Sequence, residues 1–176
     1  MWPEPSSITL SGVGKKFTRQ WILREYSDQF ISGVITGVRG RNGSGKSTLL
    51  RLLAGQLTPS RGSVVFRYGN QPVAPAEHFR HVRWAGPYFE LPEELTIAEF
   101  LKFHFTQKAV LKELGGVAQV QEFTGLGHVR NRQLLDCSSG MRQRILLASA
   151  LYSATPVLLL DEPTVTLDEA AARWFQ

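Results

Sequence analysis

Short apolar runs divide the first third of the chain into strand-like pieces. Such runs at residues 8–10, 21–23 and 34–38 predict strands, and the β-branched third run is expected to be buried. A basic turn is expected over residues 12–16, between the first two strands. Leucines at helical spacing predict a helix over residues 47–54. The third strand and this helix flank a glycine-rich run, so the unit predicted here is strand, loop, helix.

The remaining chain alternates helical patterns with two more short strands. A strand is predicted at residues 63–66, and a helix over 95–114 with Thr96 as its N-cap and Glu99 three residues later. Further helices are expected over residues 117–123 and 141–151. Pro156 then precedes an apolar strand over 157–160. No internal repeat or low-complexity segment interrupts this α/β order.

The glycine-rich run fits the pattern G-x-x-x-x-G-K-[ST] at every fixed position, from Gly40 to Ser47 (GRNGSGKS). Glycines let successive backbone N–H groups point at phosphate oxygens, and the following helix presents its positive end. The pattern places Lys46 on the β- and γ-phosphates and the Ser47 hydroxyl on Mg²⁺. We therefore expect a nucleotide site here, rather than a glycine-rich turn without a ligand.

Two carboxylates, Asp161 and Glu162, end the strand predicted at residues 157–160. A buried strand delivers such groups to its carboxyl end, beside a phosphate loop in α/β folds. Asp161 is expected to hold Mg²⁺, and Glu162 to polarise an attacking water. The alternative is a strand that simply ends in solvated acids.

The composition is that of an ordinary folded protein, with an excess of basic over acidic residues. The 176 residues are 43% hydrophobic and carry a formal net charge of +5, which suits nucleotide phosphates, nucleic acid or a membrane face, or only solubilises the surface. The single cysteine, Cys137, cannot form an internal disulfide and indicates a reducing compartment. No apolar stretch approaches the roughly 18–20 residues that cross a bilayer. These features predict a cytosolic protein, recruited to any membrane by another chain.

Several ordered motifs give the chain a resemblance to the ATP-binding subunits of ABC transporters. CSSGMRQR at 137–144 resembles the signature segment, usually Leu-Ser-Gly-Gly-Gln followed by Arg-Gln-Arg. DEPT at 161–164 matches the extended Walker B motif, and TLD at 166–168 resembles the D-loop. NGSGKSTLL at 42–50 is the form of the Walker A loop typical of this family. The similarity runs from about residue 8 to residue 168.

The resemblance implies a fold. We expect a P-loop NTPase (RecA-like) α/β core with N-terminal antiparallel β strands and an inserted helical subdomain. The chain would then be a single ABC domain over residues 1–176. Its core lobe would comprise 1–86 and 145–176, and its helical subdomain 87–144.

The resemblance also implies site residues. Phe17 would stack on adenine, with Trp21 as a competitor for that role, while Lys46 and Glu162 would be catalytic, and Ser47 and Asp161 would ligate Mg²⁺. The residues expected on ATP in the same subunit are Phe17, Gly40, Asn42, Gly43, Ser44, Gly45, Lys46, Ser47 and Thr48. Those expected to reach ATP of the opposite subunit, in a head-to-tail homodimer or heterodimer, are Ser138, Ser139, Gly140 and Met141.

Two departures from the family pattern bear on catalysis. Pro87 occupies the position of a glutamine that ligates Mg²⁺ and senses the transporter. The switch histidine expected downstream of the D-loop has no counterpart, because all four histidines precede Asp161: His78, His81, His104 and His128. A truncated product, or a reduced member with impaired hydrolysis, is therefore expected.

The function implied is binding and hydrolysis of Mg-ATP to power a separate membrane permease, from the cytoplasmic side. Two alternatives stay open. One is a non-transport ABC ATPase that acts on ribosomes or DNA, although nucleic acid is not the expected partner. The other is an ATP switch that binds without hydrolysis.

Overall fold

The computed structural model describes residues 5–86, 90–111, 113 and 115–164. The chain divides into two compact units, Met1–Arg83 and Trp84–Gln176. Within the described residues, no helix combines the length and apolar character needed to cross a membrane. The predicted division into a two-part core lobe and a helical subdomain stays a prediction.

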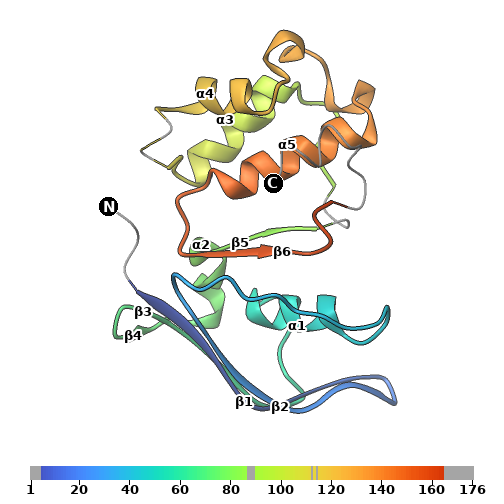
Figure 1. The fold of residues 1–176 in the computed structure, drawn as a ribbon, viewed down its shortest axis with the longest axis vertical. Coiled ribbons are helices and arrows are strands. Elements are labelled where there is room, and N and C mark those ends of the chain that lie inside the picture. The colour runs from blue at the N-terminus through green and yellow to red at the C-terminus, as the bar shows by residue number, and fades with distance from the viewer. Residues whose placement is uncertain (1–4, 87–89, 112, 114, 165–176) are drawn as a thin grey trace. The chain divides into compact units, whose positions relative to one another are not determined.

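The first unit is built on a four-stranded antiparallel sheet in the order β2-β1-β3-β4. Figure 1 shows α1 lying along one face of this sheet. The elements of the unit are β1 (Ser6–Phe17), β2 (Gln20–Ile31), α1 (Lys46–Leu53), β3 (Arg61–Tyr68), β4 (Gln71–Pro72), a 3-10 turn (Pro75–Glu77) and α2 (His78–His81).

Alternate side chains along the strands are apolar and point to one face of the sheet, which forms the core of the first unit. Ile8 and Leu10 of β1 and Phe66 of β3 are at most 2% exposed. Val13 continues the same face after an irregularity in the pairing. The four leucines of α1 are also buried, which explains why a helix of only eight residues is stable here.

The basic turn predicted over residues 12–16 is wrong, because β1 continues through this segment to Phe17. Register shifts on either side of Val13 absorb the extra residues, with Gly12 in a left-handed conformation at φ 56°. The chain turns only at Thr18 and Arg19.

The buried strand predicted over residues 34–38 is also wrong. These residues form no strand, and the side chains of Val34 and Ile35 are 58% and 101% exposed. A β-branched run becomes a strand only where a neighbouring strand offers hydrogen bonds. The four strands of the first unit pair among themselves and leave this segment unpaired.

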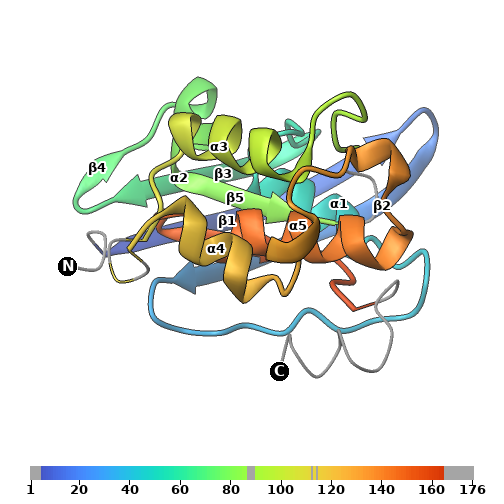
Figure 2. The ribbon, with the colours of Figure 1, turned by 90° about the horizontal axis from the view of Figure 1, so that it is seen from above.

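The second unit consists of helices and a two-stranded sheet of β5 and β6, in which β5 begins two residues before the unit does. Helix α3 packs against both α4 and α5 (Figure 1 and Figure 2). Its core includes Leu101, Val120, Leu134 and Ile145, all fully buried. The elements are β5 (Val82–Ala85), α3 (Ile97–Gln107), α4 (Val117–Phe123), two 3-10 turns (Gly127–Val129 and Leu134–Asp136), α5 (Ser139–Leu151) and β6 (Val157–Leu160).

Thr96 caps α3 as predicted. Its hydroxyl accepts from the Glu99 N–H, and the Glu99 carboxylate accepts from the Thr96 N–H at 2.8 Å. The helix ends at Gln107, however, and not at residue 114. Beyond it the chain is extended, and Val110 bridges to Ser153 after α5. This pairing competes with the helical hydrogen bonds and stops the helix early.

Candidate nucleotide-binding site

The loop between residues 40 and 46 curls around the ammonium group of Lys46. Lys46 Nζ donates to the carbonyl oxygens of Gly40 and Arg41, at 2.9 and 3.1 Å. Gly43 and Gly45 have φ of 77° and 98°, in the left-handed region that favours glycine. Helix α1 follows at once, with no side-chain cap and no acidic residue in its first turn. Its first N–H groups can therefore meet an anion.

Strand β2 supports this loop from behind. A Cβ on Gly45 would lie 2.8 Å from Ile22 Cγ2 and 3.4 Å from Leu23 Cδ2. The glycine thus lets the helix start pack directly on the sheet. The sequence alone did not predict that Ile22 and Leu23 support the loop, because this contact depends on how β2 is placed against the start of α1.

Phe17 lies on the face of the sheet that meets the phosphate loop. Lys15 pairs with Leu23, which contacts the loop, and cross-strand partners share a face. Phe17 is two residues from Lys15 and so lies on the same face, with Lys15 Nζ 5.2 Å from its ring centroid. The ring is 43% exposed and available for stacking.

Trp21 lies on the opposite face. It pairs with Lys16, whose Nζ is 5.7 Å from the Trp21 ring centroid. The shift in register between Lys15 and Lys16 leaves Ile22 as an extra residue, and this separates Trp21 from the face that contacts the loop. The structure thus favours Phe17 over Trp21 as a neighbour of the phosphate loop.

In the second unit, Asp161 and Glu162 follow β6 as predicted, in contrasting environments. Asp161 is 3% exposed, and its N–H donates to the Ala85 carbonyl at 2.9 Å. Its Oδ2 is buried without a hydrogen-bond partner among the described residues. Glu162 is exposed and has a φ of 47°, an uncommon conformation for a residue with a side chain. One carboxylate is thus sheltered and the other faces solvent.

The signature-like segment forms the start of α5. Ser138 is the N-cap, and its hydroxyl accepts from the Met141 N–H at 3.3 Å. The helix begins at Ser139, two residues earlier than predicted, so Ser139 and Gly140 lie in its first turn. Ser138 and Ser139 are exposed, whereas the helix from Ile145 to Ala150 is buried. The helix thus has an exposed start and a buried body.

Comparison with known proteins agrees with this arrangement of motifs. The family model described as ABC transporter matches residues 23–165. The chain belongs to the ABC transporter family. It is therefore an ATP-binding ATPase of this family, with the α/β P-loop fold.

Individual relatives cover most of the chain. The cytochrome c biogenesis ATP-binding export protein CcmA of Rhizobium etli is 33% identical over 171 residues, which are 96% of this chain and 79% of that protein. The cobalamin import ATP-binding protein BtuD of Halobacterium salinarum is 32% identical over 167 residues, 92% of this chain and 42% of that protein. The structure of a bacterial Atm1-family ABC exporter with ATP bound has a TM-score of 0.80 at 21% identity, over 99% of this chain and 32% of that chain, and supports the fold.

Within the ABC signature helix, three polar side chains hold neighbouring segments in place. Gln143 Nε2 donates to the Pro163 carbonyl at 3.1 Å, which ties the helix to the segment after Glu162. Arg142 donates to the carbonyls of Leu134 and Leu135, and Arg144 to that of Thr124. Sequence reasoning treated these residues only as part of the motif and missed their anchoring contacts.

Other expected ABC features fall outside the described residues. These are Pro87 at the glutamine position and the D-loop at 166–168. Two of the histidines are buried by packing: His78 lies edge-on to Phe66, and His104 Nε2 is 3.1 Å from Ser153 Oγ.

Proposed function

We propose that this ABC ATPase binds Mg-ATP through the loop of residues 40–48 and hydrolyses it with Glu162. The observation that carries the proposal is the loop itself, wrapped around the Lys46 ammonium and followed by an uncapped helix start. In the proposed complex the ATP phosphates exchange places with the carbonyls of Gly40 and Arg41 as partners of Lys46. Phe17, on the same face of the sheet, stacks on the adenine.

The residues that would hold Mg²⁺ are the Ser47 hydroxyl and the Asp161 carboxylate. Asp161 fits a cation, because its buried Oδ2 has no partner among the described residues and an unpaired buried carboxylate oxygen is costly. The described residues contain no cluster of three metal-ligating side chains. Mg²⁺ takes one or two protein ligands beside phosphates and water. When bound, the ion would neutralise charge that develops on the phosphates.

Glu162 is the proposed general base. Its exposed carboxylate follows directly on buried Asp161, so it can accept a proton from a water next to the γ-phosphate. The left-handed backbone at Glu162 supports a functional role, since such strain often occurs at active sites. The bond from Gln143 to Pro163 holds the segment that carries it.

The proposed partner is a membrane permease, with the chain on its cytoplasmic side. The relatives include both an export protein and an import protein, so the proposal names neither a direction of transport nor a transported substrate. Ser138, Ser139, Gly140 and Met141 are proposed to bind the γ-phosphate held by a second subunit, in a head-to-tail dimer. Their position at the exposed start of α5 supports this.

Glu162→Gln tests the proposal. ATP affinity should stay within about twofold of wild type, because the side chain keeps its size, while phosphate release should fall by about 100-fold or more. Binding is measured by equilibrium dialysis, hydrolysis by phosphate release, and ATP-dependent dimerisation of the variant by light scattering. A wild-type chain that binds ATP without hydrolysing it would instead establish a binding-only switch. Equal hydrolysis by both proteins would exclude Glu162 as the base.

A further inference from the structure

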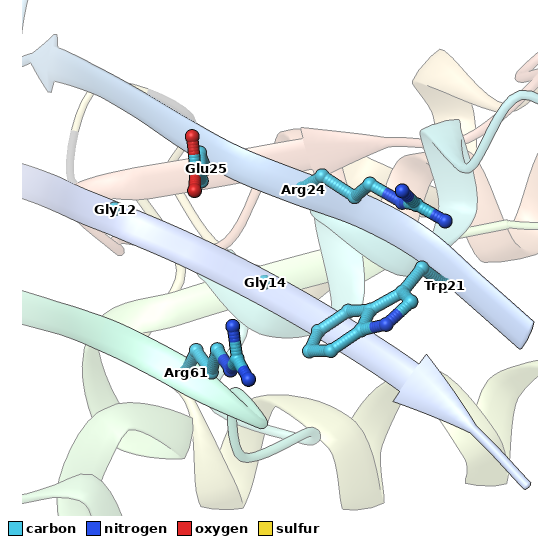
Figure 3. Close-up of a pocket in the computed structure, with 6 residues that line it drawn as sticks. All are labelled: Gly12, Gly14, Trp21, Arg24, Glu25 and Arg61. Carbon is cyan, nitrogen blue, oxygen red and sulfur yellow. The ribbon is translucent and has the colours of Figure 1, made fainter. Parts of the chain in front are cut away.

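A small hollow lies on the sheet of the first unit, where β1, β2 and β3 meet (Figure 3). Its volume is about 190 Å³, less than the 300 Å³ or so at which pockets for drug-sized ligands begin. The residues that line it are Gly12, Gly14, Trp21, Arg24, Glu25 and Arg61.

This hollow lies on the face of the sheet opposite to the phosphate loop. Gly14 pairs directly with Arg61, and Trp21 pairs with Lys16, two residues from Gly14, so these residues share a face. The loop contacts the other face, through Ile22 and Leu23. The hollow is therefore separate from the proposed ATP site.

Glycine at position 14 makes room for the indole ring. A Cβ there would lie 2.9 Å from Cζ3 of Trp21, so the ring lies across β1 because position 14 has no side chain. Figure 3 shows the Trp21 ring as one wall of the hollow, with Arg61 beside it. Arg61 Cζ is 5.2 Å from the ring centroid, and this contact orients the guanidinium.

The guanidinium groups of Arg24 and Arg61 have N–H donors that can bind a ligand. Within the part of the chain that the structure describes, neither forms a hydrogen bond or ion pair. Lys16 adds a third positive charge at the Trp21 ring. The first unit as a whole carries twelve Lys and Arg against four Asp and Glu, whereas the second carries eight against eleven. These charges favour an anion at the hollow.

Glu25 limits which anions can bind in the hollow. It is the one acidic residue among those lining the hollow, and its carboxylate can only accept hydrogen bonds. An anion that keeps an O–H can donate to Glu25 while its other oxygens accept from the arginines. Hydrogen phosphate and protonated phosphate monoesters have such a group, and sulfate has none.

We propose that this hollow binds a small phosphate, either inorganic phosphate or the monoester of a small molecule packed on Trp21. Arg24 and Arg61 bind its oxygens, and Glu25 accepts its P–O–H hydrogen. The site does not depend on nucleotide at the phosphate loop.

The test uses the full chain with Lys46→Ala, which removes the phosphate-loop lysine from any phosphate binding. Inorganic phosphate, phenyl phosphate and sulfate are titrated at pH 6 and constant ionic strength by isothermal calorimetry. Phosphate should bind, Arg61→Gln should weaken it by about fivefold or more, and Arg67→Gln should not. Arg67 is the matched control, on the same strand and face about 20 Å away. Tighter binding of phenyl phosphate identifies a monoester, and equal binding identifies inorganic phosphate.

Sulfate that binds as tightly as phosphate, or an Arg61→Gln variant with unchanged affinity, would overturn the proposal, as would no binding of phosphate. A second measurement avoids the Lys46 variant. In the wild-type chain saturated with Mg²⁺ and a non-hydrolysable ATP analogue, which releases no phosphate, added phosphate should shift the indole N–H resonance of Trp21, assigned by its loss in Trp21→Phe. A resonance that does not move under these conditions also contradicts the site.

Discussion

Helices α1 and α5 both begin at a motif that the ABC family uses for phosphate, but their first turns are built differently. At α1 the N-cap is Gly45 in a left-handed conformation, with no side-chain cap. At α5 the N-cap is Ser138, whose hydroxyl already accepts from the Met141 N–H. The first helix start is held by the sheet behind it, and the second by its own side chain.

These two helix starts are therefore stabilised in different ways. In α1 the first N–H groups have no side-chain cap and are left for a ligand. The packing of Gly45 against Ile22 stabilises this helix start in place of a cap. In α5 the Ser138 cap satisfies one N–H, so this end is stable without a ligand. We therefore expect substitutions at the start of α1 to act through packing on the sheet, and substitutions at the start of α5 to act through the side-chain cap.

The largest effect is expected for Gly45→Ala. The new Cβ would lie 2.8 Å from Ile22 Cγ2, at a φ of 98°. The free energy of unfolding should fall by about 2–4 kcal/mol, measured by urea denaturation. Gly43→Ala is the control, because Gly43 also has a positive φ but no atom within 4 Å of its Cβ position. It should cost only about 1 kcal/mol, and an equal loss at both positions would refute the packing explanation.

Ser138→Ala should cost about 1 kcal/mol of unfolding free energy, since it removes the cap of α5. Ser139→Ala, one residue into the helix, should cost little. Ser138→Asp sharpens the comparison, because aspartate restores the cap but adds a negative charge where a phosphate of the second subunit would approach. In the Glu162→Gln background, where ATP is not consumed, we expect Ser138→Asp to be as stable as its parent but to lose ATP-dependent dimerisation by light scattering. A normal dimer would argue against the proposed phosphate contact.

The smallest effect concerns the other helix with a side-chain cap, α3. Hydrogen bonds from the backbone and hydroxyl of Thr96 lower the pKa of the Glu99 carboxyl below 4.5. Because the folded-state pKa is lowered, the stabilisation is complete above pH 4.5 and is lost as the pH falls through the folded-state value. Thr96→Ala should move this pKa back toward 4.5, measured by NMR titration. Thr106→Ala, at the other end of α3, should leave it unchanged.

The features that were predicted correctly from the sequence depend on residues that are close together in the chain. The phosphate loop, the capping box at Thr96 and the strand before Asp161 all combine a local pattern with a local backbone preference. The ABC motifs belong to this class, and the family model confirms the family that they indicated, while the roles of their single residues stay predictions.

The errors arose where distant segments decide the outcome. Residues 34–38 have a strand-like composition but no partner strand in the first unit, and the helix predicted to residue 114 gives way to pairing of Val110 with Ser153. The anchoring bonds of Arg142 and Gln143, and the placement of Trp21 over Gly14, require three-dimensional contacts that no local pattern encodes.

Nucleotide affinity of Lys46→Ala tests the central claim most directly. If the loop around the Lys46 ammonium is the ATP site, loss of this charge should weaken ATP binding by about 100-fold or more, measured by equilibrium dialysis with Mg²⁺ present. Arg51→Ala in the last turn of α1 serves as a control for general loss of positive charge. ATP affinity retained in Lys46→Ala would contradict the assignment of the phosphate loop.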